Sequence, residues 1–215
     1  MEHAVVIIGG DPPDARAAAR ADRSAFVVAA DSGLDHARSL GLDVDLVVGD
    51  LDSVSSDALA WAEARQIPVE RFLVDKDATD TELAIMAAVE RGARHVMLLS
   101  GAGDRLDHLL SVVLLLGHVA FAAVTLEAWV GRAHVLRVIG PGALVVPAGS
   151  GETLSLLPIG GPAHGITTTG LHYPLHDETL AAATSRGVSN VVATSHPSVT
   201  VAQGTLLVIR PEALP

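Results

Sequence analysis

The chain carries two different patterns of apolar and polar residues. Over roughly the first 127 residues, short apolar runs alternate with longer alanine-rich stretches. The apolar runs predict buried strands at 4–10, 25–33, 45–50, 95–101 and 122–128, and the stretches between them predict helices at 13–22, 34–41, 55–66, 79–92 and 106–117. Apolar strands that alternate with helices are typical of a parallel sheet covered on both faces, whose ligands bind at the carboxyl ends of the strands. We therefore predict an α/β N-terminal domain with a mostly parallel sheet.

From about residue 132 the pattern changes to short runs of alternating apolar residues between glycines and prolines. These runs lie at 133–142, 143–151, 153–161, 165–175, 188–199 and 205–212. No helix-length periodic segment occurs among them, which favours antiparallel strands in a sandwich or a barrel. We therefore expect an all-β, sandwich-like C-terminal domain, with the α/β domain at 1–130 and the β domain at 131–215.

Composition narrows the class of protein. Hydrophobic residues make up 49% of the chain and charged residues 18%, as in a compact globular protein. The net charge of −11, without a run of Lys or Arg, argues against a nucleic acid or a membrane surface as partner. Cysteine is absent, which excludes disulfides and thiolate metal sites. The longest apolar run, 109–124, is shorter than the roughly 20 residues that span a bilayer, and the N-terminal stretch lacks the features of a signal peptide. We expect a soluble, cytoplasmic protein.

A pair of aspartates follows the predicted strand at 45–50. Asp50 and Asp52 are two residues apart in the run GDLDS. If the strand continued for two residues, both carboxylates would project to the same side, and they would repel each other unless a cation lay between them. The alternative is a sharp turn with both side chains in solvent.

Further carboxylates follow other predicted strands. Asp31 follows the run FVVAA, Asp104 and Asp107 follow HVMLLSGAG, and the acidic segment 75–82 precedes a helix. Because the carboxyl ends of parallel strands lie at one edge of a sheet, these side chains would surround a common cleft. Hard oxygen ligands of this kind suit Mg²⁺, which keeps waters and binds one or two carboxylates together with substrate phosphates.

Each of these carboxylates also has a structural interpretation. Thr79 and Glu82 fit a capping box, with Asp80 in the first helical turn, where the helix dipole favours it. Asp104 fits a helix cap, and Asp31 fits a simple turn. Asp50 and Asp52 have no comparable stabilising role, so the combination, rather than any single residue, indicates a cation site.

Known phosphate-binding loops do not match the sequence. No G-x-x-x-x-G-K-[ST] run occurs, which excludes a P-loop. The segment GGDPPD (9–14) lacks the G-x-G-x-x-G spacing of a dinucleotide-binding fold. It fits either a loop that brings backbone N–H groups toward a phosphate or a tight turn before a helix.

Four acidic motifs and two later motifs occur in an order that resembles the thiamine pyrophosphokinases. They are DSG (31–33), GDLDS (49–53), KDATDTE (76–82) and GDRLDH (103–108), followed by TTGLHYPL (168–175) and GVSN (187–190). The resemblance covers nearly the whole chain. It implies a parallel α/β domain followed by a β-sandwich, assembled as a homodimer with the active site between domains. It also implies Mg²⁺-dependent transfer of a pyrophosphoryl group from ATP to the hydroxyl of thiamine, which gives thiamine diphosphate and AMP.

The resemblance implies a role for individual residues, motif by motif. It implies Mg²⁺ ligands at Asp50, Asp52 and Asp80, which form the catalytic set together with Asp107. It implies ATP contacts at Asp31, Lys76, Thr79 and Arg105, and thiamine contacts at Asp107, Tyr173, Ser189 and Asn190. Arg105 offers a planar, charged fork to phosphate oxygens. Tyr173, with Trp129 as a second candidate, offers an aromatic face to the thiazolium cation.

Several of these residues have alternative interpretations. Arg105 could pair with Asp104 on the surface, and Lys76 could be solvated. Tyr173 could be a half-buried residue of the β domain, Trp129 could pack at the domain junction, and Ser189 and Asn190 could end a strand.

Three positions depart from the family pattern in the nucleotide region. Ser32 stands at the middle of the Asp-Gly-Gly turn, Asp104 replaces the second glycine before Arg105, and Ser111 stands where an Asn is expected. These changes affect the expected nucleotide pocket and leave the metal motifs intact. Two other functions stay open: the same chemistry on another hydroxymethyl acceptor such as a pterin, and a non-catalytic sensor of nucleotide or thiamine.

Overall fold

The computed structural model describes residues 2–73, 77–103 and 105–214. The chain divides into two compact units, the first formed by 1–112 with 123–131 and the second by 113–122 with 132–215. The segment 113–122 thus groups with the later strands, although it precedes the sequence-based boundary. The predicted division of roles between 1–130 and 131–215 stays a prediction.

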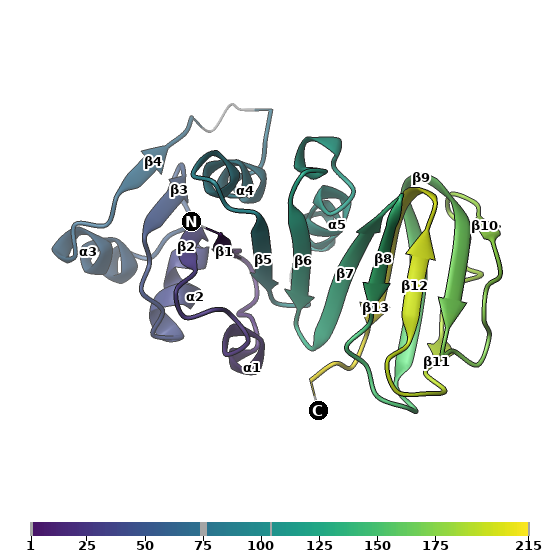
Figure 1. The fold of residues 1–215 in the computed structure, drawn as a ribbon. Coiled ribbons are helices and arrows are strands. Elements are labelled where there is room, and N and C mark those ends of the chain that lie inside the picture. Colours follow the sequence, from purple (N-terminus) through teal and green to yellow (C-terminus); the bar gives the residue numbers. More distant parts are fainter. Residues whose placement is uncertain (1, 74–76, 104, 215) are drawn as a thin grey trace. The chain divides into compact units, whose positions relative to one another are not determined.

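The first unit contains a parallel sheet in the order β4-β3-β2-β1-β5-β6 (Figure 1). Its strands are β1 (His3–Ile7), β2 (Phe26–Ala30), β3 (Leu46–Gly49), β4 (Val69–Arg71), β5 (His95–Ser100) and β6 (Thr125–Val130). All neighbouring pairs are parallel. In β1, β2 and β3 four consecutive residues are buried, and because successive side chains point to opposite faces, both faces of the sheet are covered there. The prediction of a parallel α/β region is confirmed.

Helices connect these strands close to the predicted positions. They are α1 (Ala15–Ala18), α2 (Gly33–Ser39), α3 (Ser56–Ala64), α4 (Asp80–Glu90) and α5 (Leu106–Leu115). α4 packs on β1, β2 and β3, and α2 packs on β1 and β2. α1 is much shorter than the predicted helix at 13–22, because the N–H groups of Arg20 and Ala21 bond to carbonyls three residues back, which tightens the chain into turns. The edge strand β4 was not predicted, since its three residues are exposed or only partly buried.

The second unit is formed mainly by antiparallel strands. They are β7 (Ala133–Ile139), β8 (Gly142–Val145), β9 (Thr153–Thr169), β10 (Glu178–Leu180), β11 (Asn190–Val191), β12 (Ser198–Val201) and β13 (Gln203–Arg210), with a short 3₁₀ helix, η1, at Val119–Phe121. The order is β7-β13-β9-β12-β8, and β10 and β11 pair with β9. The strand-rich character of this half is confirmed, and the sandwich stays a prediction.

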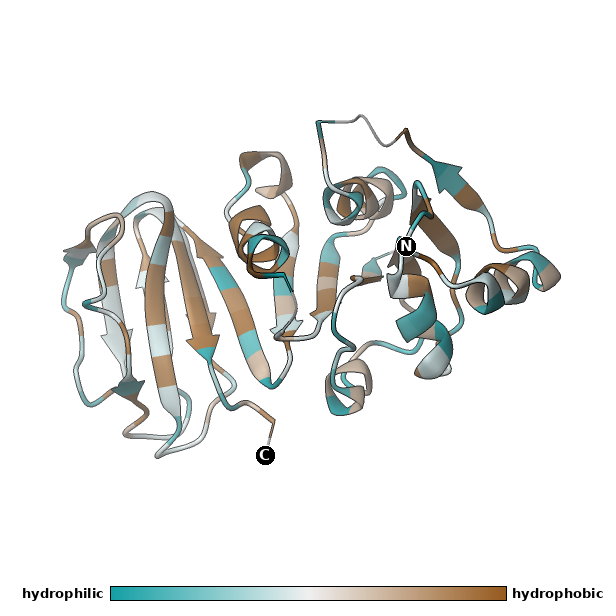
Figure 2. Ribbon diagram, turned by 180° about the vertical axis from the view of Figure 1, so that it is seen from behind, coloured by the Kyte–Doolittle hydropathy of each residue, from teal (hydrophilic) through white to brown (hydrophobic). Residues whose placement is uncertain are grey.

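The long strand β9 corrects one sequence-based expectation. The runs at 153–161 and 165–175 were expected as separate strands, but one strand covers the whole of the first run and continues to residue 169 of the second. Gly160, Gly161 and Gly165 have positive φ angles, which allow the strand to bend without ending. Its first part pairs with β13 and its last part with β12. Apolar residues concentrate along the strands of the second unit (Figure 2). Leu154 and Leu156 of β9 form a buried core together with apolar residues of the neighbouring strands.

Within the described part of the chain, no helix is long and apolar enough to cross a membrane.

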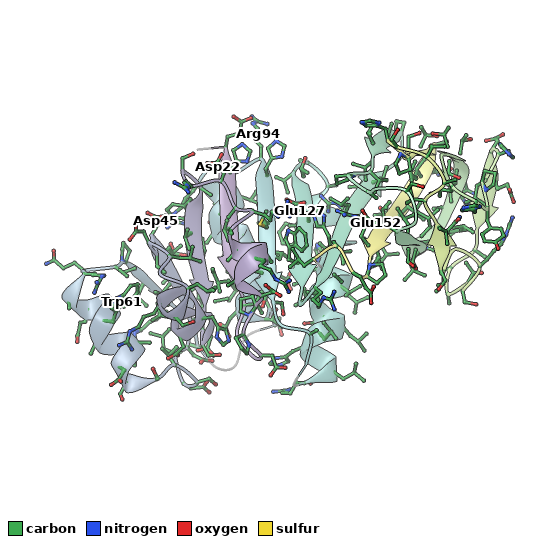
Figure 3. All side chains as sticks on the ribbon, turned by 90° about the horizontal axis from the view of Figure 1, so that it is seen from below. Asp22, Asp45, Trp61, Arg94, Glu127 and Glu152 are labelled. Carbon is green, nitrogen blue, oxygen red and sulfur yellow. The ribbon has the colours of Figure 1, made fainter. Side chains whose placement is uncertain are left out.

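The aromatic residue Trp61 on α3 makes a cation–π contact with a nearby arginine (Figure 3): the guanidinium carbon of Arg65 lies 4.6 Å from the centre of the Trp61 ring. Cation–π contacts of this kind are common on protein surfaces. Trp61 therefore has a structural partner on its own helix.

Candidate functional site

Three carboxylates converge at the carboxyl edge of the parallel sheet. Asp31 directly follows β2, and Asp50 directly follows β3. Asp31, Asp50 and Asp52 each place one carboxylate oxygen within 4.8 Å of the others. Asp31 and Asp50 are partly buried, whereas Asp52 is exposed. The expected common location of these acids is therefore present.

The chain brings Asp50 and Asp52 together by a turn and not by a continued strand. β3 ends at Gly49, and Leu51 adopts the left-handed conformation with φ +68°. The Asp52 N–H donates to Asp50 Oδ1 at 3.2 Å, and the Leu51 side chain is buried. Of the two alternatives that the sequence left open, the structure has the turn, because burial of Leu51 and the side-chain hydrogen bond favour it here. Only Asp52 is exposed, however, since Asp50 is partly buried. A left-handed residue costs about 1–2 kcal/mol, and such strain is often found at functional sites.

Asp80 lies beside this group, at the start of α4. A Cβ atom placed on Gly49 would lie 3.1 Å from Asp80 Oδ1 and 3.3 Å from Cα of Asp31. A side chain at position 49 would therefore contact both Asp80 and Asp31, which lie on either side of Gly49. The group of three close carboxylates contains Asp31, which was expected as an ATP contact, and Asp80 adjoins it.

Burial and neighbouring charges disfavour the ionised form of Asp31, so that its pKa is raised. Burial raises the pKa of Asp31, and the charges of Asp80, Asp50 and Asp52 raise it further, against a lowering by the Ser32 N–H. Asp31 Oδ1 is buried and has no hydrogen-bond partner among the described residues. A buried acceptor of this kind needs a compensating partner. A hard divalent cation, which prefers carboxylate oxygens, fits this donor set.

A cleft of about 470 Å³ in the first unit opens beside these carboxylates. Its wall combines the β1–α1 loop, the β2–α2 turn, Ser53, the first turn of α4 and the first two turns of α5. Among the predicted site residues it includes Asp31, Thr79, Asp80 and Arg105, and it also includes His108, Ser32 and Ser111. Its size lies within the range of small-molecule sites. Five segments that are separated in sequence thus contribute to one cleft.

Thr79 and Arg105 occupy different parts of this wall. The Thr79 hydroxyl accepts a hydrogen bond from the Glu82 N–H at 3.2 Å, so it caps α4 as the helix-cap interpretation required. Arg105 binds the carboxylate of Asp107 through Nε at 3.2 Å and Nη2 at 2.6 Å. This hydrogen bond lowers the pKa of Asp107 to about 2. Both side chains are more than half exposed.

Two predicted partners of the nucleotide region lie outside the described residues. They are Lys76 and Asp104. The alternative that pairs Arg105 with Asp104 therefore stays a prediction, although Arg105 does form an ion pair with another surface acid, Asp107. Asp107 is not part of the cleft wall, so its expected contact with thiamine has no support from this geometry.

The second unit holds a smaller pocket of about 140 Å³ that includes Tyr173 and Asn190. The Asn190 amide is buried and used by the backbone: Oδ1 accepts from the N–H groups of Tyr173 (3.1 Å) and Val191 (2.9 Å), and Nδ2 donates to the Tyr173 carbonyl (2.7 Å). The Tyr173 side chain is 71% exposed, not half-buried. Asn190 therefore holds the backbone that carries an accessible aromatic ring.

The remaining predicted residues of the thiamine side are placed differently. Ser189 has a positive φ of +61°, its N–H donates to Ser155 Oγ at 3.0 Å, and it is not part of the pocket wall. Trp129 on β6 is only 4% exposed, so its ring is not accessible to a ligand. Tyr173 remains the accessible aromatic candidate of the two.

Three residues that line the cleft or hold its loops were not predicted from the sequence. Asp35 and His36 on α2 bond to two loops of the site, and His108 lies in its wall. His108 belongs to the motif GDRLDH, which was a signal in the sequence. Asp35 and His36 follow Asp31 by only four and five residues, but nothing in the pattern indicated their long-range contacts.

Comparison with known proteins gives a consistent result. The family model described as "Thiamin pyrophosphokinase, catalytic domain" matches residues 18–128, and "Thiamin pyrophosphokinase, vitamin B1 binding domain" matches 144–206. A thiamine pyrophosphokinase of Bacillus subtilis (strain 168) is 24% identical over 183 residues, which are 83% of this chain and 85% of that protein.

Solved structures show the same fold. A thiamine pyrophosphokinase from Bacillus subtilis has a TM-score of 0.86 at 22% identity, over 99% of this chain and 100% of that one. A thiamin pyrophosphokinase from Geobacillus thermodenitrificans has a TM-score of 0.79 at 28% identity, over 98% of this chain and 97% of that one.

Proposed function

This chain belongs to the thiamin pyrophosphokinase family, and we propose that it transfers a pyrophosphoryl group from ATP to the hydroxyl of thiamine, which yields thiamine diphosphate and AMP. Family membership supports an enzyme that forms thiamine diphosphate. The observation that carries the proposal is the convergence of the Asp31, Asp50 and Asp52 carboxylates beside a cleft that Arg105 also lines.

The proposed cation is Mg²⁺, held by Asp31, Asp50 and Asp52 with Asp80 beside them. The close carboxylate oxygens and the buried Asp31 Oδ1 support this choice. When bound, the ion would neutralise charge on the polyphosphate. A site that brings four acids together and must accept a polyanion requires such compensation.

In the proposed reaction the hydroxyl oxygen of thiamine forms a bond to the β-phosphorus of ATP. The bond from that phosphorus to the oxygen shared with the α-phosphorus breaks, and AMP leaves with this oxygen and its electron pair. The hydroxyl proton passes to a carboxylate of the site or to water. Transfer of this kind depends on positioning and charge neutralisation more than on covalent help from side chains.

We assign the positioning of the polyphosphate to Arg105, Thr79 and the backbone of Gly9 and Gly10, which line the cleft next to Asp31. Arg105 has to exchange its partner Asp107 for a phosphate oxygen, and both are exposed enough to move. While Arg105 is paired with it, Asp107 is a weak base with a pKa of about 2, so we assign it to holding Arg105 until phosphate displaces it and not to accepting the proton. Lys76 stays a proposed phosphate contact from the sequence motif.

On the thiamine side we propose that Tyr173 stacks on the thiazolium cation. Its exposed ring and its position in the 140 Å³ pocket support this role. Asn190 supports Tyr173 through the backbone, and Ser189 stays a proposed hydrogen-bonding residue. A homodimer, a β-sandwich second domain and a cytoplasmic location complete the proposal, because the family resemblance implies them.

The direct test is an assay of AMP and thiamine diphosphate formation from Mg·ATP and thiamine, with EDTA as control. We expect equal amounts of both products and none with EDTA. AMP release with a hydroxymethyl pterin and none with thiamine would move the activity to another acceptor. Binding of Mg·ATP without AMP formation would indicate a sensor instead.

The metal assignment is tested by Asp52→Asn. We expect turnover to fall by more than about 100-fold, since loss of outer partners of a metal site alone costs about 10–100-fold. Asp57→Asn is the matched control, because Asp57 is an exposed aspartate in the first turn of α3 and not part of the cleft wall. An unchanged rate in Asp52→Asn, with the thermal melt of the wild type, would remove Asp52 from the site.

A further inference from the structure

Two adjacent side chains on α2 bond to the two loops that flank the cleft. One loop, residues 9–11, follows β1, and the other, residues 50–55, follows β3 and carries Asp50 and Asp52. α2 begins at Gly33, two residues after Asp31, so a single short helix contacts both loops and directly follows the turn that carries the third carboxylate. Its side chains Asp35 and His36 make these contacts.

Asp35 fixes the end of the 50–55 loop. Asp35 Oδ2 accepts the N–H of Ser55 at 3.0 Å, and Oδ1 accepts the Ser55 hydroxyl. Ser55 Oγ in turn accepts the Ala58 N–H at 3.1 Å, which caps α3. Leu51 and Val54 within the loop are buried. The loop that carries two of the three close carboxylates is therefore held at its far end by one carboxylate of α2.

His36 fixes the 9–11 loop. Its Nε2 lies 2.8 Å from the Gly10 carbonyl oxygen, and because a carbonyl can only accept, Nε2 carries the proton and donates. Since the peptide unit is planar and trans, holding this carbonyl also sets the direction of the Asp11 N–H. The Asp11 carbonyl accepts the Gly101 N–H at 3.1 Å, so the loop is held from two sides. Gly9 and Gly10 line the cleft.

α2 itself is firmly placed on the sheet. A Cβ on Gly33 would lie 2.1 Å from the Ile7 carbonyl oxygen, so the helix approaches β1 as closely as only glycine allows. Leu34 and Ala37 are fully buried. The positions of Asp35 and His36 are thus fixed relative to the strands whose ends form the site.

We propose that Asp35 and His36 are positioning residues with separate effects: Asp35 sets the affinity for the metal through the 50–55 loop, and His36 sets the affinity for the nucleotide through the 9–11 loop. This inference rests on the proposed function for the identity of metal and nucleotide. Outer partners that orient metal-binding groups commonly change metal affinity strongly, although they never touch the ion. A backbone hydrogen bond that orders a loop acts on the ligand of that loop in the same way.

The effect of Asp35 is measured by calorimetric titration of the full chain with Mn²⁺ alone. Asp35→Ala is expected to weaken Mn²⁺ binding by about 10-fold. Asp35→Asn keeps one acceptor oxygen for Ser55 and is expected to lose only about 3-fold, in line with the modest net effect of one hydrogen bond. Arg38→Gln, an exposed position on the same helix, is the control and is expected to match the wild type.

The effect of His36 is measured as the dissociation constant of a non-hydrolysable ATP analogue at saturating Mg²⁺. His36→Ala is expected to raise it by about 5-fold, as for the loss of one hydrogen bond. His36→Gln restores an N–H donor toward Gly10 and is expected to recover most of the affinity. Mn²⁺ binding by both His36 variants is expected to match the wild type.

The inference is decided by whether the Asp35 and His36 variants affect different ligands, the metal for Asp35 and the nucleotide for His36. If Asp35→Ala and His36→Ala weaken metal and nucleotide equally, or if Asp35→Ala binds Mn²⁺ like the wild type, the positioning roles are wrong. A failure of His36→Gln to recover nucleotide binding overturns the role of His36. A wild-type protein that binds both ligands but forms no AMP would refute the proposed function and leave these affinities as the test of α2.

Discussion

Gly49 offers the sharpest test of how closely the site is packed. It ends β3 with φ +148°, in a region that L side chains rarely adopt. A Cβ added there would lie 3.1 Å from Asp80 Oδ1 and 3.3 Å from both Cα and Cβ of Asp31. Gly49→Ala therefore combines backbone strain with a wedge between two of the acids.

The magnitude follows from these two effects. Residues forced into sparsely populated backbone regions cost about 1–3 kcal/mol. For a chain of 150–250 residues each kcal/mol corresponds to about 2–4 °C in Tm, so we expect Tm to fall by about 2–12 °C. The contacts require Asp31 and Asp80 to give way by a few tenths of an ångström, and we expect Mn²⁺ binding to weaken by about 10-fold, as for a displaced partner of a metal site.

The assay pairs thermal melting with Mn²⁺ calorimetry, and Gly41→Ala is its control. Gly41 also has a positive φ, +67°, but a Cβ there would meet nothing within 4 Å. Gly41→Ala is expected to lower Tm through strain alone and to bind Mn²⁺ like the wild type. The reasoning is refuted if Gly49→Ala melts and binds Mn²⁺ as the wild type does, or if Gly41→Ala loses metal affinity to the same extent.

Three further changes test other parts of the molecule. Burial raises the pKa of Glu152 (labelled in Figure 3), but hydrogen bonds from a backbone N–H and from Arg210 outweigh this and hold the pKa below its ordinary value of 4.5. The stability that Glu152 contributes is therefore present above pH 4.5 and is lost as the pH falls through the lowered pKa. Glu152→Gln should flatten the fall of Tm below pH 4.5, and an unchanged acid profile would contradict this. Asn190→Ala removes three partly buried hydrogen bonds to the backbone and should lower the free energy of unfolding by about 2–3 kcal/mol, whereas a wild-type denaturant midpoint would show that these bonds are dispensable. Asp107→Asn frees Arg105 from its ion pair and should lower KM for ATP by about 2–5-fold, whereas a 100-fold loss of kcat would place Asp107 in the reaction itself.

The fold of the first unit was predictable because its strands are short and almost wholly apolar. Continuous burial of β1, β2 and β3 leaves a signal that does not depend on long-range contacts. β4 has no such signal, since only Glu70 is partly buried there. The glycines at 160, 161 and 165 misled the prediction for β9, because glycine marks both a strand end and a bend.

The site was predictable in its residue types but not in its partners. Strand ends indicated where the acids lie, since this follows from topology alone. The inclusion of Asp31 in the close group, the pairing of Arg105 with Asp107 and the use of the Asn190 amide by the backbone depend on individual side-chain and turn geometry. Sequence spacing does not encode such geometry when the backbone leaves the regular regions.

Such departures from regular backbone occur in several parts of the chain, and those at the cleft link the unpredicted features of the site. Asp31 (φ +46°), Leu51 (φ +68°), Gly10 (φ +90°) and Gly49 (φ +148°) all lie in or next to the loops that hold the acids. Two of them are not glycine, so the surrounding structure has to supply the energy that keeps them there. Burial of Leu51 and the bonds of α2 to both loops provide it. The fold itself therefore holds the carboxylates close together, and the proposed cation would relieve repulsion that folding has already imposed.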